Sequence, residues 1–472
     1  MNPFRRVSLY YRSKLVPFFK LILYHQGGQE MRTKKRQKLK IKNPDAAGID
    51  IGSAVHYVCV PEGRDKECVR TFGCFTGDLH QLVQWLKKCR VKTVVMESTG
   101  VYWIPLFQIL EAQGFEVKLV NARYVKNVPG RKSDVQDCQW LQQLHSYGLL
   151  QGSFRPQGQI CSLRSYIRQR ESLTRSAGVH IQRMQKALTQ MNLHLHKVIS
   201  DITGLTGIRI IQAILEGERD PHKLASLRDH RVKNNTETIR KALEGDYKQE
   251  HLFVLSQEFG LYKTYLEKIT ECDQKIADYY GSLDTKAHKE GVQSKKPVQK
   301  NHPNFDLWGE LYRITGVDLT TIPGLDVLSA QTIISEVGVD PHRWPTEKHF
   351  TSWLGLSPAN KITGEKVFST RTRRVNNRAA TAFRLAAYAV SRSQNSLGAF
   401  CRRMKSRLGA PKAITATARK IACIFYRMLK YGQAYVEIGL ENYEQKYKAR
   451  LEKNLQKKAH ALGFELIPKT PI

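Results

Sequence analysis

Acidic residues are scarce in this sequence relative to basic ones. Its 472 residues include 42 Asp and Glu against 76 Lys and Arg, a formal net charge of +34. Such a surplus favours a polyanionic partner, because a basic side chain near a phosphate releases a condensed counterion. A ribosomal or merely soluble basic protein would share this excess. Hydrophobic residues make up 41% of the chain, which excludes a disordered polycationic tail.

The sequence also lacks paired cysteines and membrane-spanning runs. Its nine cysteines are an odd number without a CxxC pair, which argues against a disulfide framework or zinc ribbon and favours reduced thiols in the cytoplasm. The apolar stretch from Leu15 to Tyr24 is interrupted by Lys20 and is too short to span a bilayer. We therefore expect no membrane partner.

Residues 1–45 form a basic N-terminal extension. Met31 opens a basic run, Arg32 to Lys42, ahead of the first strand-like segment. We expect Met31 to be the natural start and residues 1–30 to be dispensable upstream sequence. The alternative is an arm that binds a membrane surface or nucleic acid.

Residues 46–155 have the pattern of an α/β domain. Short apolar runs predict three strands joined by short connections, after which helices and strands alternate. The expected elements are strands at Ala47–Gly52, His56–Val60, Val69–Phe75, Thr93–Met96 and Phe115–Val120, and helices that include Leu79–Leu86, Trp103–Ala112 and Asp134–Tyr147. The order β-β-β-α-β-α-β-α is that of the ribonuclease-H-like fold. Another mixed α/β domain remains the alternative.

The rest of the chain reads as mainly helical. We expect a helical or coiled-coil region at 156–280, a linker at 281–305, a mostly helical domain at 306–436 and a charged helical tail at 437–472. Apolar residues at helical spacing predict two long helices; they are Ile181, Met184, Leu188, Met191 and Leu195, and then Leu261, Tyr265, Ile269 and Ile276.

An internal repeat links two of these helical regions. Residues of Ile202–His222 match Ile322–His342 at a constant offset of 120, each copy reading apolar-x-Gly-Leu, an apolar helix and Asp-Pro-His. The second copy has the signature of a helix-hairpin-helix module, in which the turn at Gly324 could offer backbone N–H groups to a phosphate. The alternative is a helix-pair turn in which Gly is a cap, and we favour it for Gly204.

Four carboxylates stand out in the α/β region. Asp50 lies inside an apolar strand, Glu97 ends another, and Asp134 and Asp137 are spaced to share one helix face. A carboxylate in an apolar strand is costly unless it is paired, protonated or metal-bound. For a single acid a salt bridge or, at Asp134, a helix N-cap is the alternative. The four together favour a cation site, with two Mg²⁺ ions as in phosphoryl transfer.

Three segments around these acids resemble the motifs of the DEDD transposases, insertion-sequence enzymes with a RuvC-like N-terminal domain and a separate C-terminal transposase domain. The segments are Gly48–Gly52, Glu97–Gly100 and Lys132–Asp137. The C-terminal half resembles the same family at Ile322–Leu325, Trp353–Pro358 and the basic segment Arg371–Arg378, so the resemblance runs from about Ala46 to about Tyr431.

The resemblance implies a DNA transposase or recombinase in which Asp50, Glu97, Asp134 and Asp137 hold Mg²⁺. It also implies a structured guide (bridge) RNA that pairs with target and donor DNA. The enzyme would act as a homo-oligomer on DNA in the bacterial cytoplasm, associated with the nucleoid when bound.

One position departs from the family pattern. The family has a serine nucleophile directly before a glycine, and here Thr363 precedes Gly364. A threonine hydroxyl can attack when activated, although its methyl group crowds the approach to phosphorus. Thr363 is then an active nucleophile, an impaired one, or the mark of an inactive copy; as an ordinary turn residue it would have none of these roles. Ser369 is the nearby alternative hydroxyl.

Basic side chains follow this position. We expect Arg371, Arg373, Arg374 and Arg378 to clamp nucleic-acid phosphates, and the same reasoning covers Arg402, Arg403, Lys405 and Arg407. A solvated charged face is the alternative. Two other functions remain open for the whole chain: a RuvC-like nuclease or junction resolvase that uses water alone, and an inactive nucleic-acid-binding relative.

Overall fold

The computed structural model describes residues 40–121, 133–156, 158–288, 301–432 and 439–467. The chain divides into two compact units, Met1–Phe154 and Arg155–Ile472. The expected extension 1–30 with Met31 lies outside the described residues. Across the described ranges, no helix is both long and apolar enough to cross a membrane.

The first unit is built on a five-stranded sheet with strand order β3-β2-β1-β4-β5. Its elements are β1 (Ala46–Ile51), β2 (Val55–Cys59), β3 (Val69–Gly73), α1 (Thr76–Lys88), β4 (Thr93–Glu97), α2 (Trp103–Ala112), β5 (Glu116–Val120) and α4 (Asp134–Ser146). β1 pairs antiparallel with β2 and parallel with β4. The predicted order of strands and helices and the ribonuclease-H-like fold are confirmed.

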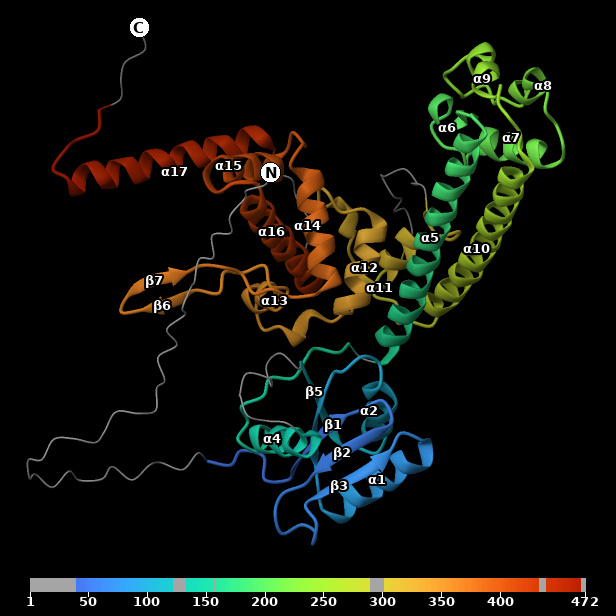
Figure 1. The fold of residues 1–472 in the computed structure, drawn as a ribbon. Helices are drawn as coiled ribbons and strands as arrows, with labels where there is room; N and C mark the ends of the chain where they lie inside the picture. The colour runs from blue at the N-terminus through green and yellow to red at the C-terminus, as the bar shows by residue number, and fades with distance from the viewer. Residues whose placement is uncertain (1–39, 122–132, 157, 289–300, 433–438, 468–472) are drawn as a thin grey trace, which may run out of the picture. The chain divides into compact units, whose positions relative to one another are not determined.

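Alternation along β1 decides which helix covers which face of the sheet. Ala47 and Ile49 are fully buried and pack in one core with residues of α1 and α2. Gly48 points to the other face, where it meets α4. Because side chains alternate along a strand, Asp50 shares the face of Gly48. Figure 1 shows α4 and the α1–α2 pair on opposite sides of the sheet.

The second unit begins with a helical hairpin. The antiparallel helices α5 (Gly158–Gln190) and α10 (Gln249–Gly281) pack along each other. Arg170 on α5 and Asp273 on α10 form a buried ion pair, and Arg170 also donates to the carbonyl of Asn301 at 3.0 Å. Two long helices were predicted here, and both are present.

The predicted apolar stripes of these helices need two corrections. Leu195 is fully buried as expected, but it lies beyond the end of α5 and begins a new helix. Leu261 was expected on the packed face of α10, yet it is 45% exposed, and Tyr262 is buried in its place. The other predicted residues of α10, Tyr265, Ile269 and Ile276, lie on the packed face, so only the first position of the stripe is displaced by one residue.

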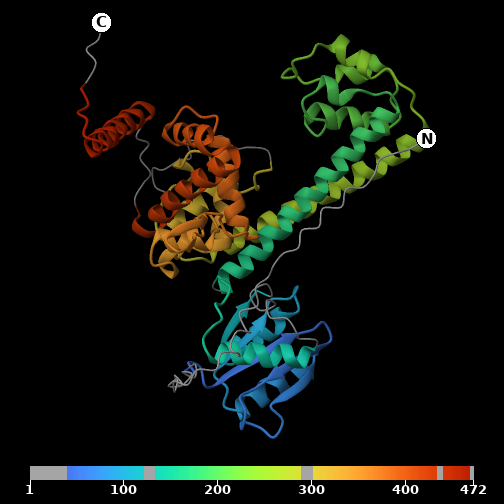
Figure 2. The same cartoon turned by 60° about the vertical axis from the view of Figure 1, so that its left-hand side comes forward.

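Four short helices form a cap at one end of the α5–α10 pair, as Figures 1 and 2 both show. They are α6 (Leu195–Val198), α7 (Leu205–Leu215), α8 (Pro221–Ser226) and α9 (Thr236–Ala242). Buried residues of the cap and of both long helices form one continuous hydrophobic cluster. The cap therefore folds as part of the hairpin.

The remaining elements are mostly helical, as predicted. They are α11 (Leu307–Thr315), η1 (Leu319–Thr321), α12 (Val327–Val337), η2 (Pro341–Arg343), α13 (Glu347–Trp353), β6 (Lys361–Thr363), β7 (Lys366–Ser369), α14 (Arg378–Val390), α15 (Ser396–Leu408), α16 (Ala410–Tyr431) and α17 (Leu440–Ala461). The β6–β7 hairpin was not predicted.

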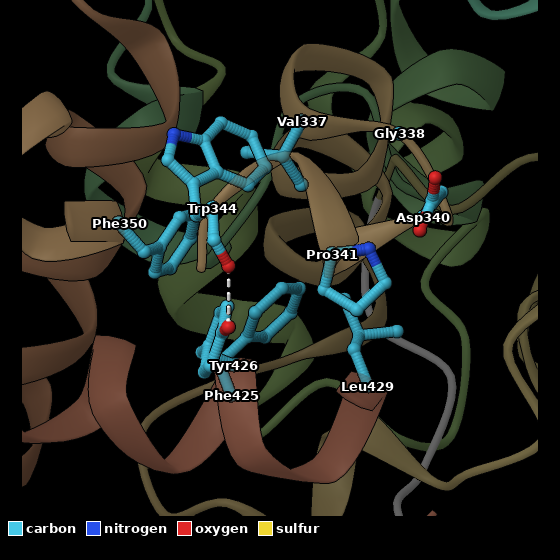
Figure 3. Close-up of a pocket in the computed structure, with 9 residues that line it drawn as sticks. All are labelled: Val337, Gly338, Asp340, Pro341, Trp344, Phe350, Phe425, Tyr426 and Leu429. Carbon is cyan, nitrogen blue, oxygen red and sulfur yellow. Dashed lines mark hydrogen bonds between the residues drawn. The ribbon is translucent and has the colours of Figure 1, made fainter. Parts of the chain in front are cut away.

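An aromatic core joins α13, α14 and α16. Phe350 is nearly fully buried, and its ring packs against Trp344, Phe383 and Tyr426. The Tyr426 hydroxyl donates a hydrogen bond of 2.6 Å to the carbonyl of Trp344. Figure 3 shows the rings of Trp344, Phe350 and Tyr426 around a small hollow. The contacts indicate a role in stability.

The two repeat copies share a helix and a capped turn. Asp220 and Asp340 each accept a hydrogen bond from the backbone N–H two residues later, of His222 and His342, at 2.9 Å. Neither copy is a strand, and no continuous helix passes through Gly204, which is the N-cap of α7. The helices start at different points, since α12 begins two repeat positions later than α7.

Candidate active site

Two of the predicted acids come from neighbouring strands. Ile49 and Met96 are partners in the parallel β1–β4 ladder, and Asp50 and Glu97 are the next residues. Both side chains therefore start from the same end of the sheet and the same face. The predicted adjacency of these two strands is confirmed.

Helix α4 crosses the same face and runs antiparallel to β1. Near its C-terminal end, the side-chain amide of Asn43 donates to the carbonyl of His145 at 2.7 Å. Further along, the side-chain amide of Gln142 donates to the carbonyl of Ala46 at 3.2 Å. A Cβ on Gly48 would lie 2.3 Å from the backbone nitrogen of Gln142. The missing side chain therefore lets the helix lie directly on the strand.

This packing brings the other two acids toward the first pair. The Gly48 position also meets the carbonyl oxygen of Cys138, so two residues further along β1 Asp50 lies opposite the preceding helical turn. That turn carries Asp134 and Asp137. The interaction with Cys59 and burial are the main causes that raise the pKa of the Cys138 thiol; the Asp50 carboxylate adds to them, which is consistent with this placement.

The environments of the four acids differ. Glu97 is only 7% exposed, and its Oε1 accepts a 3.3 Å hydrogen bond from the Thr99 hydroxyl. Asp50 and Asp137 are half-buried and Asp134 is exposed. Ser133 is the N-cap of α4, and its hydroxyl oxygen accepts from the N–H of Gln136. The alternative in which Asp134 caps the helix is therefore wrong.

The carboxyl groups themselves are not gathered into a ligand set. Among the described residues, which include all four acids, no group of three or more His, Cys, Asp or Glu side chains is placed to hold a metal ion. The backbone nevertheless directs the four carboxylates, which are hard oxygen donors, to one end of one sheet face. Helix α4 covers this face, and its close packing requires glycine at position 48. This donor set suits a divalent cation such as Mg²⁺.

A prediction follows for Gly48. Gly48→Ala places a methyl group 2.5 Å from the carbonyl oxygen of Cys138, so α4 must move away from the sheet. We expect a loss of about 1–3 kcal/mol in unfolding free energy, the usual range for overpacking. Hydrogen exchange of α4 amides measures it. Gly77→Ala is the control, because nothing lies within 4 Å of a Cβ there. Equal protection in the two variants would contradict the packing.

His145 makes the anchoring of α4 sensitive to acid. It is 1% exposed, and its Nε2 lies 2.9 Å from the Thr93 hydroxyl. Burial, aided by Lys118, lowers the pKa of His145 to about 4. The unfolded chain then binds a proton at higher pH than the folded one. This group therefore lowers stability as pH falls from about 6.5 to about 4, by about 3 kcal/mol at the acid end.

His145→Gln should remove this acid sensitivity. We expect hydrogen exchange of β4 and α4 amides, corrected for intrinsic rates, to lose protection below pH 6 in the unmodified chain and to lose much less in the variant. His80, which is exposed on α1, supplies the control His80→Gln, which should behave like the unmodified chain. The same acid response in all three proteins would exclude His145 as its source.

Thr363 lies in the second unit, in the β6–β7 hairpin. It pairs with Lys366, and the turn between them is made by Gly364 and Glu365, both with positive φ. Such a pair of residues is typical of a tight type I′ turn. Thr363 is exposed, and so are the apolar side chains of its hairpin, of which Phe368 is 82% exposed. Thr363 therefore flanks the turn and is accessible to a partner.

Gly324 has a packing reason to be glycine. Its φ is +86°, and a Cβ would lie 2.4 Å from the carbonyl oxygen of Ala386 on α14. Close approach of α14 thus accounts for the residue without any phosphate. The N-cap of α12 is Asp326, whose side chain accepts from the N–H of Ser329 at 2.8 Å. The role of Gly324 in binding nucleic acid stays a prediction.

The predicted arginine clamp is divided in the structure. Arg371 and Arg374 are exposed. Arg373 donates to the carbonyl of Ser352 at 2.7 Å. Arg378 begins α14 and forms an ion pair with Glu171 of α5. Arg371 and Arg374 are therefore better placed than Arg378 to meet a phosphate.

The second arginine group is divided in a similar way. Arg402 donates to the carbonyl of Ser393 at 2.8 Å, and the guanidinium of Arg403 lies over the ring of Tyr447. Lys405 and Arg407 are exposed on α15.

Two family models match the chain. Residues 47–193 match a DEDD transposase model, described as "Transposase", and residues 318–402 match a model of the transposase IS116/IS110/IS902 family. The chain belongs to the IS110 family of DEDD transposases. A comparison with curated proteins gave no match.

Membership of this family makes the chain a DNA transposase or recombinase, and DNA is its partner. The DEDD domain implies the use of a divalent metal ion. The matched segments contain the four acids and the hairpin with Thr363. Residues 194–317 lie between the two matches, and they include the helical cap and α10.

Proposed function

We propose that this transposase cleaves DNA and transfers strands of an insertion sequence, with Asp50, Glu97, Asp134 and Asp137 as its acidic centre. The observation that carries the proposal is the packing of α4 on Gly48, which directs two pairs of carboxylates to one end of one sheet face. Two Mg²⁺ ions bound there would activate the attacking oxygen and stabilise the leaving oxygen.

The four acids have different tasks in this proposal. Glu97 is buried at the end of β4 and held by Thr99, so its carboxylate would supply a fixed ligand. Asp134 and Asp137 both lie in the first turn of α4, so they would supply two ligands from one end of the helix. Asp50 lies between Glu97 and the first turn of α4, so it would be the central ligand of the proposed site.

The proposed nucleophile is the hydroxyl of Thr363. Attack by its Oγ1 on a phosphodiester would form one P–O bond to the protein and break one P–O bond of the DNA backbone. The exposed position next to the hairpin turn supports this role, because an extended DNA strand can reach it. The proposed phosphate contacts beside it are Arg371 and Arg374, together with Arg373 and Arg378 and the turn at Gly324.

We further propose that a structured RNA guides the reaction and that the protein acts as a homo-oligomer in the bacterial cytoplasm, on the nucleoid. The excess of positive charge, +34 over the chain, supports more than one nucleic-acid partner. The test is a plasmid recombination assay with the element ends, the target and the non-coding RNA that flanks the gene. Products that form equally well without RNA would contradict guidance, and an absence of strand transfer with every component present would contradict the proposed reaction.

A further inference from the structure

A groove of about 600 Å³ lies in the helical cap, within residues 194–317 that neither family model covers. The groove is formed where two loops face each other. One loop joins α6 to α7 and the other joins α8 to α9. In Figures 1 and 2 these four helices gather around the end of the α5–α10 pair.

Hydrogen bonds hold the two walls of the groove together. The side-chain amide of Asn234 in the α8–α9 loop donates to the carbonyl of Val198, the last residue of α6, at 2.7 Å. The backbone N–H of Asp229 donates to the hydroxyl of Thr206 at 3.0 Å. Because both contacts join the α8–α9 loop to the α6–α7 side, the groove is preformed.

Two lysines supply positive charge from opposite walls. Lys197 and Lys233 both line the groove and both are exposed. Within the described residues, neither has a carboxylate partner. The acids nearby are already engaged: Asp229 pairs with Arg231 at 2.8 Å, and Asp201 accepts from the N–H and hydroxyl of Thr203.

The N-terminus of α7 adds hydrogen-bond donors to the same groove. Its N-cap is Gly204, which has no side chain to accept from the first backbone N–H groups. Gly204, Leu205 and Thr206 all line the groove. A helix N-terminus without a capping side chain suits an anion. Here it lines the same groove as the two lysines, and the three features favour one kind of ligand.

We propose that this groove binds the phosphodiester backbone of a nucleic acid. Lys197 and Lys233 would contact phosphate oxygens from the two walls, and the first N–H groups of α7 would donate to a phosphate between them. A groove of about 600 Å³ has room for more than one phosphate of a chain, whereas one free phosphate would fill a small part of it. The cap is then a nucleic-acid contact additional to the matched transposase segments.

The test compares two double charge reversals in the full chain. Lys197→Glu with Lys233→Glu removes both groove lysines. Arg209→Glu with Lys186→Glu is the matched control, because it changes the charge equally at exposed positions that do not line the groove. Binding of a labelled DNA duplex and a labelled RNA hairpin is measured against salt concentration. We expect the groove variant to lower the salt slope by about 2, one for each lost phosphate contact.

The control should lower the slope much less, and Lys197→Arg with Lys233→Arg should restore it. Ultraviolet crosslinking of both probes locates the contact independently of affinity, and we expect crosslinked peptides from 196–206 and 229–234. Equal slope changes in the two reversal variants, or an absence of crosslinks in both loops, would overturn the proposal. None of these readouts requires strand transfer, so a failure of the groove proposal can be distinguished from a failure of the proposed strand-transfer reaction.

Discussion

Asp50→Asn is expected to abolish DNA cleavage and strand transfer while the α/β unit stays folded. Asparagine has nearly the same size, so β1 and its contact with α4 are retained, but one negative charge at the centre of the acidic site is lost. Loss of an outer partner of a metal ligand already costs about 10–100-fold in metal affinity or activity. We therefore expect loss of a ligand itself to exceed about 100-fold, measured as recombination product in the plasmid assay.

The matched control is Glu62→Gln, which removes one carboxylate charge from an exposed loop of the same unit. It should retain activity. Circular dichroism and the hydrogen-exchange protection of β1 should be unchanged in both variants. An Asp50→Asn protein that recombines DNA at the normal rate would exclude the proposed acidic mechanism, whatever the outcome for Thr363.

Thr363→Ala is expected to eliminate any covalent protein–DNA adduct. The alanine lacks the oxygen that would bond to phosphorus, whereas Thr363→Ser retains it and removes the crowding methyl group. We therefore expect the serine variant to form at least as much adduct as the natural chain. Adducts are measured on denaturing gels after incubation with labelled element ends and a divalent metal salt.

Two further variants locate the nucleophile. Thr370→Ala is a control of the same chemical change seven residues away, and it should leave the adduct unchanged. An adduct that persists in Thr363→Ala would transfer the role to another hydroxyl, and Ser369→Ala is then the first variant to measure. Absence of an adduct even in Thr363→Ser would favour a RuvC-like nuclease that uses water, or an inactive relative.

The α/β unit could be predicted from the sequence because its elements carry their own signals. The strand β1 alternates between residues that pack on α1 and α2, such as Ile49, and residues that face α4. The helix α2 runs from Trp103 to Ala112, as predicted. Such segments have a periodicity that matches one local structure, and tertiary contacts reinforce it.

The hairpin around Thr363 gave no such signal. Six of the seven residues of β6 and β7 are exposed, so no alternation of apolar and polar residues marks the strands. Its turn, Gly364-Glu365, is not one of the common Asn-Gly or Asp-Gly pairs. Only the backbone pairing of β6 with β7 identifies these strands, and a local sequence pattern does not contain that information.

The sequence by itself determined the family, the order of the elements in the first unit and the four acids, because each depends on residue types at short spacings. Only the tertiary structure decided that Gly48 admits α4 onto the sheet, that Gly324 packs against α14 and that Arg378 pairs with Glu171. The groove between Lys197 and Lys233 likewise exists only in the folded cap. The physical reason is that these features arise between segments that are distant in the chain. A glycine or an arginine could contact several partners, and only the packing of the folded chain selects one.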